Sequence, residues 1–191
     1  LKTSSKILSD IESQILSEQM DTEEQSDAEL GKRLGFESFE KRSESSFLSL
    51  EEQTVFPEQD LQQAQWVCSH PLYQKAKKLY ARVWPFTKDH YEQAGPYASG
   101  YFRVYANINL IPLKIFTALN EEGQDDRLGA QVAQESYRLS LVYLDRIQES
   151  LNVILFGIQE MDWLRLTLRD IQEIREEVIF HLDALKRSKN L

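Results

Sequence analysis

Three histidines are the side chains of this 191-residue chain best suited to metal binding or proton transfer, and their surroundings fit no motif. A di-metal carboxylate site in a helical bundle needs glutamate three residues before histidine on two helices, so that both ligands lie one turn apart. The residues three positions before His70, His90 and His181 are Val67, Thr87 and Val178. A mononuclear site would require three separate segments to converge, and nothing in their spacing predicts this. We therefore expect no metal site.

Two pairs of neighbouring reactive residues each have a chemical and a structural interpretation. Glu177 and His181 are four residues apart, so on a helix they would face each other as a metal or proton-transfer pair. The favoured interpretation is a surface charge ladder, with His181 at the edge of an apolar seam. Cys68 and His70 are two residues apart, but a nucleophilic cysteine needs an electropositive site and a positioned base. A semi-buried structural cysteine is favoured instead.

No catalytic sequence motif accompanies these residues. The seven glycines form no Gly-x-Ser-x-Gly, P-loop or Gly-x-Gly-x-x-Gly pattern. Segment 31–35 is basic and flanked by glycines, but it is too short and isolated to cradle a phosphate. The sequence thus predicts a protein that is not an enzyme and that carries no cofactor.

The best candidate for a binding surface is a basic, aromatic helix over residues 72–88. Its Lys75, Lys78 and Arg82 lie on one side, among tyrosine, tryptophan and phenylalanine side chains. Because basic groups neutralise phosphates and aromatic faces stack on bases, this mixture suits a nucleic acid. The favoured partner is an acidic protein surface, either the chain's own N-terminal arm or another protein. Plain solvated charge is the third alternative.

The charge distribution favours a protein partner over a polyanion. The net charge of −9 divides into −9 for residues 1–60, +5 for residues 61–120 and −5 for residues 121–191. The basic middle third therefore lies between two acidic segments, which repel nucleic acid and anionic lipid.

Residues 1–57 are predicted to form an acidic, serine-rich arm. One amphipathic helix is expected over 4–20, followed by a solvated linker over 21–28. The composition favours a tail that is partly disordered. However, four phenylalanines within 21 residues favour an arm that docks on a partner or on the chain's own core. Three of these phenylalanines are contact candidates: Phe36, Phe39 and Phe47.

Residues 58–191 are predicted to form a helical bundle domain. A helix or a broken pair of helices is expected over 59–84, because Pro85 should end it. A second helix is expected over 96–119, kinked or divided at Pro112. This helix carries an aromatic stripe that we expect in the core rather than around a ligand. The stripe consists of Tyr97, Tyr101, Phe102 and Tyr105.

The last 79 residues contain no proline and have apolar residues at helical spacing. This pattern predicts two long antiparallel helices, with a reversal at 157–162. Without the reversal, one helix of about 60 residues would span about 90 Å and expose its apolar stripe. Because strand-type alternation is absent, the chain is predicted to be all-α: a four-helix-type bundle with an extended N-terminal arm.

Together these features predict a non-catalytic helical protein-interaction module: an adaptor, an assembly factor or a structural subunit of a larger complex. The expected partner is another protein or a second copy of the chain, bound through the basic helix and the phenylalanines of the arm. Two alternatives remain open: a nucleic-acid-binding protein that uses residues 72–88, and a bundle with a small-ligand or metal site. The single Cys68 and the absence of long apolar runs favour a cytoplasmic location without a membrane span.

Overall fold

The computed structural model describes residues 2–34, 58–93, 95–123, 127–157 and 162–188, which contain helices and no strand. The helices are α1 (Lys2–Leu34), α2 (Glu58–Ser69), α3 (Pro71–Glu92), α4 (Ala98–Ile108), α5 (Leu110–Glu122), α6 (Arg127–Gly157) and α7 (Asp162–Ser188). The prediction of an all-α chain is therefore confirmed. None of the described helices combines the length and the apolar character that crossing a membrane requires.

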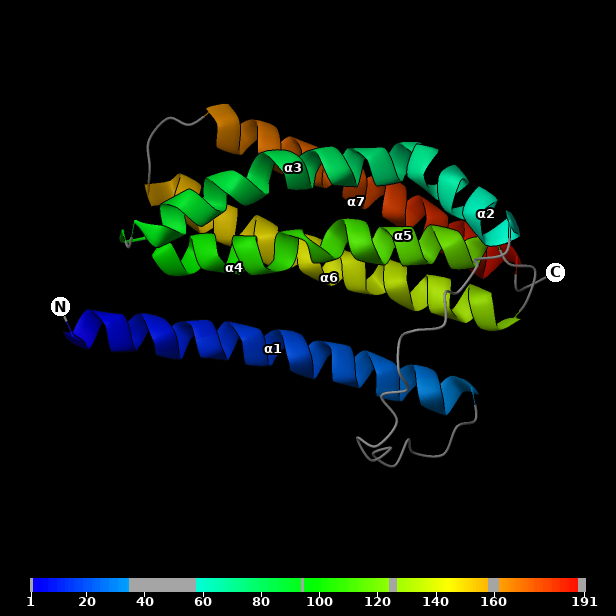
Figure 1. Ribbon diagram of the computed structural model, residues 1–191, viewed down its shortest axis with the longest axis horizontal. Helices are drawn as coiled ribbons and strands as arrows, with labels where there is room; N and C mark the ends of the chain where they lie inside the picture. The colour runs from blue at the N-terminus through cyan, green and yellow to red at the C-terminus, as the bar shows by residue number, and fades with distance from the viewer. Residues whose placement is uncertain (1, 35–57, 94, 124–126, 158–161, 189–191) are drawn as a thin grey trace.

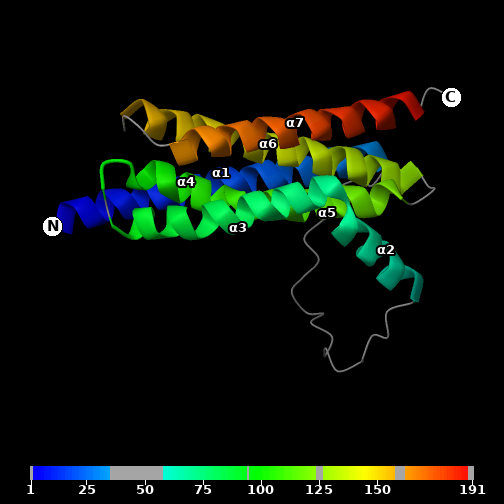
Figure 2. The ribbon, with the colours of Figure 1, turned by 90° about the horizontal axis from the view of Figure 1, so that it is seen from above.

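Helix α6 is the central element of the fold. It packs against α4, α5 and α7, and α3 packs against the same three helices. Figure 1 shows that α4 and α5 run in one direction and that α3 and α6 run in the other, while Figure 2 shows α2 angled away from the bundle axis. The core between these helices consists of fully buried side chains, among them Leu72, Ile115, Leu144 and Ile147. Each such side chain contributes about 1.5–3 kcal/mol when it is buried.

The predicted reversal at 157–162 is confirmed. α6 ends at Gly157, α7 begins at Asp162, and the two helices pack side by side in opposite directions (Figure 1). Ile154 on α6 and Leu164 on α7 have no exposed surface. The long apolar faces of α6 and α7 are therefore covered by each other and by the rest of the bundle.

The helix predicted over 96–119 is divided, but before the expected position. α4 ends at Ile108 and α5 begins at Leu110, so the break falls at Asn109. Pro112 lies in the first turn of α5. Because the first four amide groups of a helix have no acceptor within that helix, a proline in this turn removes no hydrogen bond.

The prediction that Pro85 ends the preceding helix is wrong. α3 continues to Glu92, and Pro85 lies exposed in its interior. The residues after the proline are well packed: the rings of Phe86 and Trp163 have centroids 3.9 Å apart, and Thr87 is fully buried. This packing outweighs the roughly 3 kcal/mol that a proline in a helix interior costs.

The N-terminal arm is more helical than its composition predicts. α1 is one continuous helix, about 50 Å long at 1.5 Å per residue, and it includes segment 21–28, which was expected to be a solvated linker. The segment is helical because its side chains contact the bundle: Thr22, Glu23 and Ser26 all bond to residues of α5 or α6.

Replacing Pro85 by alanine is expected to stabilise the protein by about 1–3 kcal/mol, because it restores a backbone hydrogen bond inside α3. The matched control is Pro71→Ala at the first position of the same helix, where proline is favoured. That substitution should give no gain. The measurement is the free energy of unfolding from urea denaturation followed by circular dichroism. Equal effects of the two substitutions would contradict the prediction.

Candidate functional site

α1 packs on α4 and α6 through a seam of polar side chains. Gln19 donates a hydrogen bond to the carbonyl oxygen of Ala106 in α4 at 3.0 Å, and further α1 side chains bond to α6. Among the described α1 residues, Ile15 is the one buried apolar side chain, whereas Leu16 and Met20 are exposed. No described α1 residue belongs to the hydrophobic core cluster. Over residues 9–33, the described contacts of this helix with the bundle are therefore mainly hydrogen bonds and ion pairs, rather than the apolar stripe that usually docks a helix.

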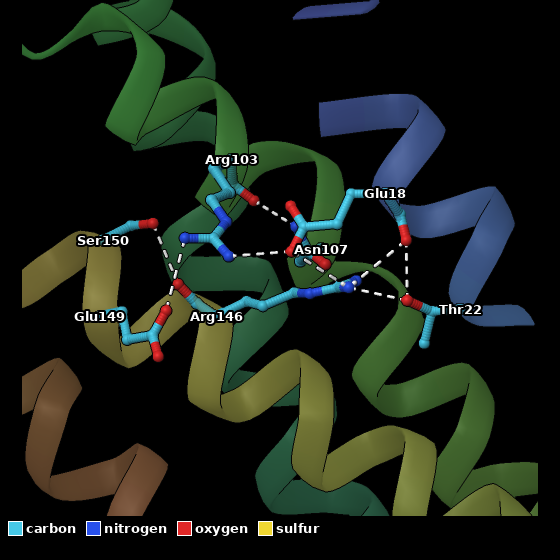
Figure 3. Close-up of polar contacts among 7 residues, drawn as sticks. All are labelled: Glu18, Thr22, Arg103, Asn107, Arg146, Glu149 and Ser150. Atoms are coloured by element: carbon cyan, nitrogen blue, oxygen red, sulfur yellow. Dashed lines mark hydrogen bonds and ion pairs between the residues drawn. The ribbon is translucent and has the colours of Figure 1, made fainter. Parts of the chain in front are cut away.

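The centre of the seam is a pair of arginines that share one carboxylate (Figure 3). Arg103 of α4 and Arg146 of α6 place Nη2 atoms 3.2 and 3.3 Å from Oε1 of Glu18. Arg146 also donates to Oγ1 of Thr22 at 2.7 Å, and Arg103 donates to Glu149 at 3.4 Å. Arg146 is only 9% exposed, so its charge has lost most of its hydration. Glu18 is its one ion-pair partner among the described residues.

Three buried polar atoms of this cluster have no hydrogen-bond partner among the described residues. They are Nε of Arg103, Nη1 of Arg146 and Oδ1 of Asn107. The amide nitrogen of Asn107 is satisfied, since it donates to the carbonyl oxygen of Arg103 at 2.7 Å. A buried donor or acceptor without a partner costs about 1–3 kcal/mol. The side chains that α1 brings to the groove therefore satisfy it incompletely.

A pocket of about 640 Å³ opens beside Arg103, between α1, α4 and α6. Its lining combines apolar side chains with the charged groups of the cluster: Ile11, Ile15, Val153, Ile154, Arg103, Glu18 and Glu149. α4 approaches α6 closely here at Gly100, where a Cβ atom would lie 3.4 Å from the side chain of Ile154. The pocket thus offers both the apolar surface and the charge that an amphipathic ligand requires.

Two further carboxylates, Glu23 and Glu135, hold the C-terminal half of α1 on the bundle. Glu23 accepts hydrogen bonds from Lys114 of α5, at 2.5 Å, and from the hydroxyl group of Tyr143 in α6. Burial and this carboxylate raise the pKa of Tyr143 well above its ordinary value. Glu135 of α6 accepts from α1 side chains, one of them the Arg33 guanidinium at 2.6 Å. Burial alone would raise the pKa of Glu135, but these donors outweigh it and hold the pKa below its ordinary value.

The basic surface that the sequence singles out faces α7. Lys75 pairs with Glu177 and Arg82 pairs with Asp170, the latter at 2.6 Å, while Lys78 is exposed. Acidic side chains therefore oppose this helix within the chain, but they come from α7 and not from the N-terminal arm. The aromatic contact candidates Phe36, Phe39 and Phe47 lie outside the described residues.

Sequence reasoning missed the arginine cluster under α1. Arg103 and Lys114 contribute to the basic middle third, but their carboxylate partners are 85 and 91 residues away in the chain. A weak signal for Arg146 does exist, because it lies beside Ile147 on the apolar face of a predicted helix. A charged residue on such a face indicates a buried ion pair with another element.

A second polar cluster joins α5, α6 and α7. Glu122 accepts a hydrogen bond from the hydroxyl group of Tyr137 at 2.7 Å and lies 3.1 Å from Nδ1 of His181. His70, at the start of α3, meets His181 edge-on with ring centroids 5.5 Å apart. His181 thus bonds to a carboxylate of α5, and not to Glu177, its expected neighbour on α7. Glu177 pairs across to α3 instead.

Burial and the neighbouring imidazole change the pKa values in this second cluster. The pKa of His70 is lowered by burial first and by the His181 charge second. Burial alone would raise the pKa of Glu122, but hydrogen bonds from His181 and Tyr137 outweigh it, and the pKa lies below its ordinary value. Among the described residues, no group of three or more His, Cys, Asp or Glu side chains is arranged to hold a metal ion.

Cys68 and the aromatic stripe are the other features with a chemical interpretation. Cys68 is exposed, so the semi-buried position expected for it is wrong. In this turn of α2 the buried side chain is Val67, because α2 contacts only one side of the bundle through α3 and α5. In the aromatic stripe, Tyr101 and Phe102 are buried as predicted, whereas Tyr97 lines the pocket beside Arg103.

No family model matches this chain, and neither a curated protein sequence nor a solved structure matches it. The features of the chain that bear on function are therefore the two polar clusters and the pocket. Of these, the groove under α1 combines buried charge, unpaired polar atoms and open space.

Stability is expected to fall as the pH drops from about 7 to about 5, and His70→Asn should remove much of that fall. Because the pKa of folded His70 lies below its ordinary 6.5, the unfolded chain takes up the proton first, and protonation favours unfolding. Asparagine keeps an acceptor for the Leu72 amide, which His70 caps at 3.3 Å. The melting temperatures of both proteins at the two pH values give the result. An equal fall in both would contradict it.

Reversing one charge of the Arg82–Asp170 pair should weaken the packing of α3 on α7. Arg82→Asp is expected to cost about 1 kcal/mol of unfolding free energy, since it places two carboxylates together at a half-buried site. The double variant Arg82→Asp/Asp170→Arg should recover most of the loss. Lys78→Glu, at an exposed position of the same helix, is the control and should change little. A double variant no more stable than Arg82→Asp would show that the pair does not couple the helices.

Proposed function

We propose that this chain is a non-catalytic helical protein-interaction module: an adaptor, an assembly factor or a structural subunit of a larger complex. Its body is a four-helix-type bundle made of α3, α4 with α5, α6 and α7, and α1 is its N-terminal arm. The partner is another protein or a second copy of the chain, and the compartment is cytoplasmic.

The observation that carries this proposal is the chemistry of the α1 seam. A helix that belongs to a core buries apolar side chains, but α1 contributes no described residue to the hydrophobic core cluster. Contacts between separate proteins have the character seen here, with arginine and tyrosine at the centre and polar groups around them. Arg103, Arg146 and Tyr143 supply those central groups. The bundle thus offers a surface suited to recognising a helix.

The nucleic-acid alternative has weaker support. Of the three basic side chains proposed for it, Lys75 and Arg82 are neutralised by carboxylates of α7. A phosphate backbone would have to displace these pairs before it gained their charge. Of these three, only Lys78 has no ion-pair partner among the described residues, and one free cation binds a polyanion weakly.

Affinity capture from the native source tests the proposal. The tagged full-length chain is expected to co-purify with a protein partner in stoichiometric amount. A chain that lacks residues 1–56 is expected to stay folded, because the core cluster excludes α1, and to lose the partners that contact the arm itself. Quantitative mass spectrometry measures the partner, and a cooperative thermal transition in circular dichroism shows that the shortened chain is folded.

The control is the full-length variant Glu24→Gln, which alters an exposed carboxylate of α1 and should retain the partner. Failure of the full-length chain to capture any stoichiometric protein would contradict the interaction function. A shortened chain that keeps every association would show that the arm takes no part in partner binding.

A further inference from the structure

We propose that the groove between α4 and α6 is a binding site for an acidic amphipathic helix of a partner protein, and that α1 occupies this site until the partner displaces it. The inference rests on the proposed interaction function and assigns to it a surface and a class of ligand. α1 is then both an arm and an internal competitor.

The first support is charge complementarity between the groove and its present occupant. Arg103, Lys114 and Arg146 lie along the groove, on three different helices of the bundle. α1 sets Glu18 against both arginines and Glu23 against the lysine (Figure 3 shows the arginine end). A helix that docks in a groove is read through side chains on one face, so the ligand of this groove must carry carboxylates on that face.

The second support is that α1 leaves the groove unsatisfied. Nε of Arg103, Nη1 of Arg146 and Oδ1 of Asn107 are buried without a hydrogen-bond partner among the described residues. All three atoms belong to the bundle and not to α1. A helix that brought further carboxylate or carbonyl oxygens, and a donor for the asparagine, would pair groups that α1 leaves unpaired. Such a helix would form more hydrogen bonds with the groove than α1 does, and should therefore bind it more tightly.

The third support is the open space beside α1. Ile11 is only half-buried and lines the pocket of about 640 Å³ together with Val153 and Ile154 of α6. A larger apolar side chain at the position of Ile11 would fill more of this space and bury more apolar surface. The expected ligand is therefore an acidic helix with a large apolar residue about two turns before its first groove-facing glutamate.

Displacement of α1 does not require the bundle to unfold. The side chains of Glu18 and Glu23 are 45% and 33% exposed, so their ion pairs are screened by water. Ile15 is the one buried apolar contact among the described residues of α1. Elements with few buried apolar contacts open at low free energy, and the core cluster remains complete when α1 leaves.

The test uses the full-length protein and a fluorescein-labelled peptide with the sequence of residues 2–34, with binding followed by fluorescence anisotropy. In the intact protein the peptide competes with α1 of the same chain, so binding should be weak. The variant Glu18→Gln/Glu23→Gln weakens only this internal competitor and leaves the groove unchanged. It is expected to bind the peptide at least about ten-fold more tightly than the intact protein does.

The matched control is Glu24→Gln/Asp27→Asn, which makes the same change of net charge on the same helix. Both residues are exposed, and no ion pair or hydrogen bond joins them to the described bundle. This variant should bind the peptide as weakly as the intact protein. Equal affinity of all three proteins, or no binding by the Glu18→Gln/Glu23→Gln protein, would overturn the proposal.

Two altered peptides test the chemistry assigned to the ligand, against the Glu18→Gln/Glu23→Gln protein. A peptide with the same two substitutions should bind about ten-fold more weakly, because it cannot pair with the arginines and the lysine. A peptide with Ile11→Phe should bind more tightly, because its ring enters the pocket. A neutralised peptide that binds as well as the original would overturn the requirement for acidic groups. A phenylalanine peptide that binds no better would overturn the assignment of the pocket.

Two other occupants of the groove are outcomes of the same experiment. Light scattering of the Glu18→Gln/Glu23→Gln protein should report a monomer. A dimer would indicate that α1 of a second copy occupies the groove instead. If a single-stranded oligonucleotide binds this variant more tightly than the peptide does, the groove is a nucleic-acid site instead. If the peptide tests fail while affinity capture still returns a stoichiometric partner, that combination would overturn the assignment of this groove but not the proposed interaction function.

Discussion

Arg146 is 9% exposed on a stretch of α6 whose neighbours Leu144 and Ile147 have no exposed surface. A guanidinium cannot give up its proton at such a site, so it must be paired with acceptors from another element. α1 provides them through the Glu18 carboxylate and the Thr22 hydroxyl group. The position of α1 along the bundle follows from this requirement, because sliding the helix by one residue would turn both acceptors away from the arginine.

The polar requirement of Arg146 is met at the edge of the hydrophobic core, where α6 faces α1. α6 contacts α4, α5 and α7 through apolar side chains and α1 through polar ones. The core cluster contains no described residue of α1, so the bundle does not depend on α1 to build its core. α1 does cover part of that core, because Tyr143 donates to Glu23. Ile154 of the core also lines the pocket with Ile15 of α1.

The parts of the fold that could be predicted from the sequence are those set by local pattern. Apolar periodicity and the absence of proline were enough to predict the two C-terminal helices and their reversal at 157–162. The prediction that Pro85 ends a helix is wrong because the packing of Phe86 outweighs the local preference of proline. The arginine cluster could not be predicted as a whole, because Arg146 and Thr22 are 124 residues apart. The position of Arg146 on an apolar face indicates that it needs a partner, but not which residue supplies it.

The incorrect prediction of a linker over 21–28 also bears on the stability of α1. A helix with few buried apolar side chains has little stability of its own, so α1 depends on its contacts with α4, α5 and α6 to remain ordered. Release of α1 is then accompanied by a gain of chain entropy, which offsets part of the ion pairing that holds it. The composition that made this segment resemble a linker thus also favours release of α1 in the proposed exchange, and a more apolar arm would bind the bundle more tightly.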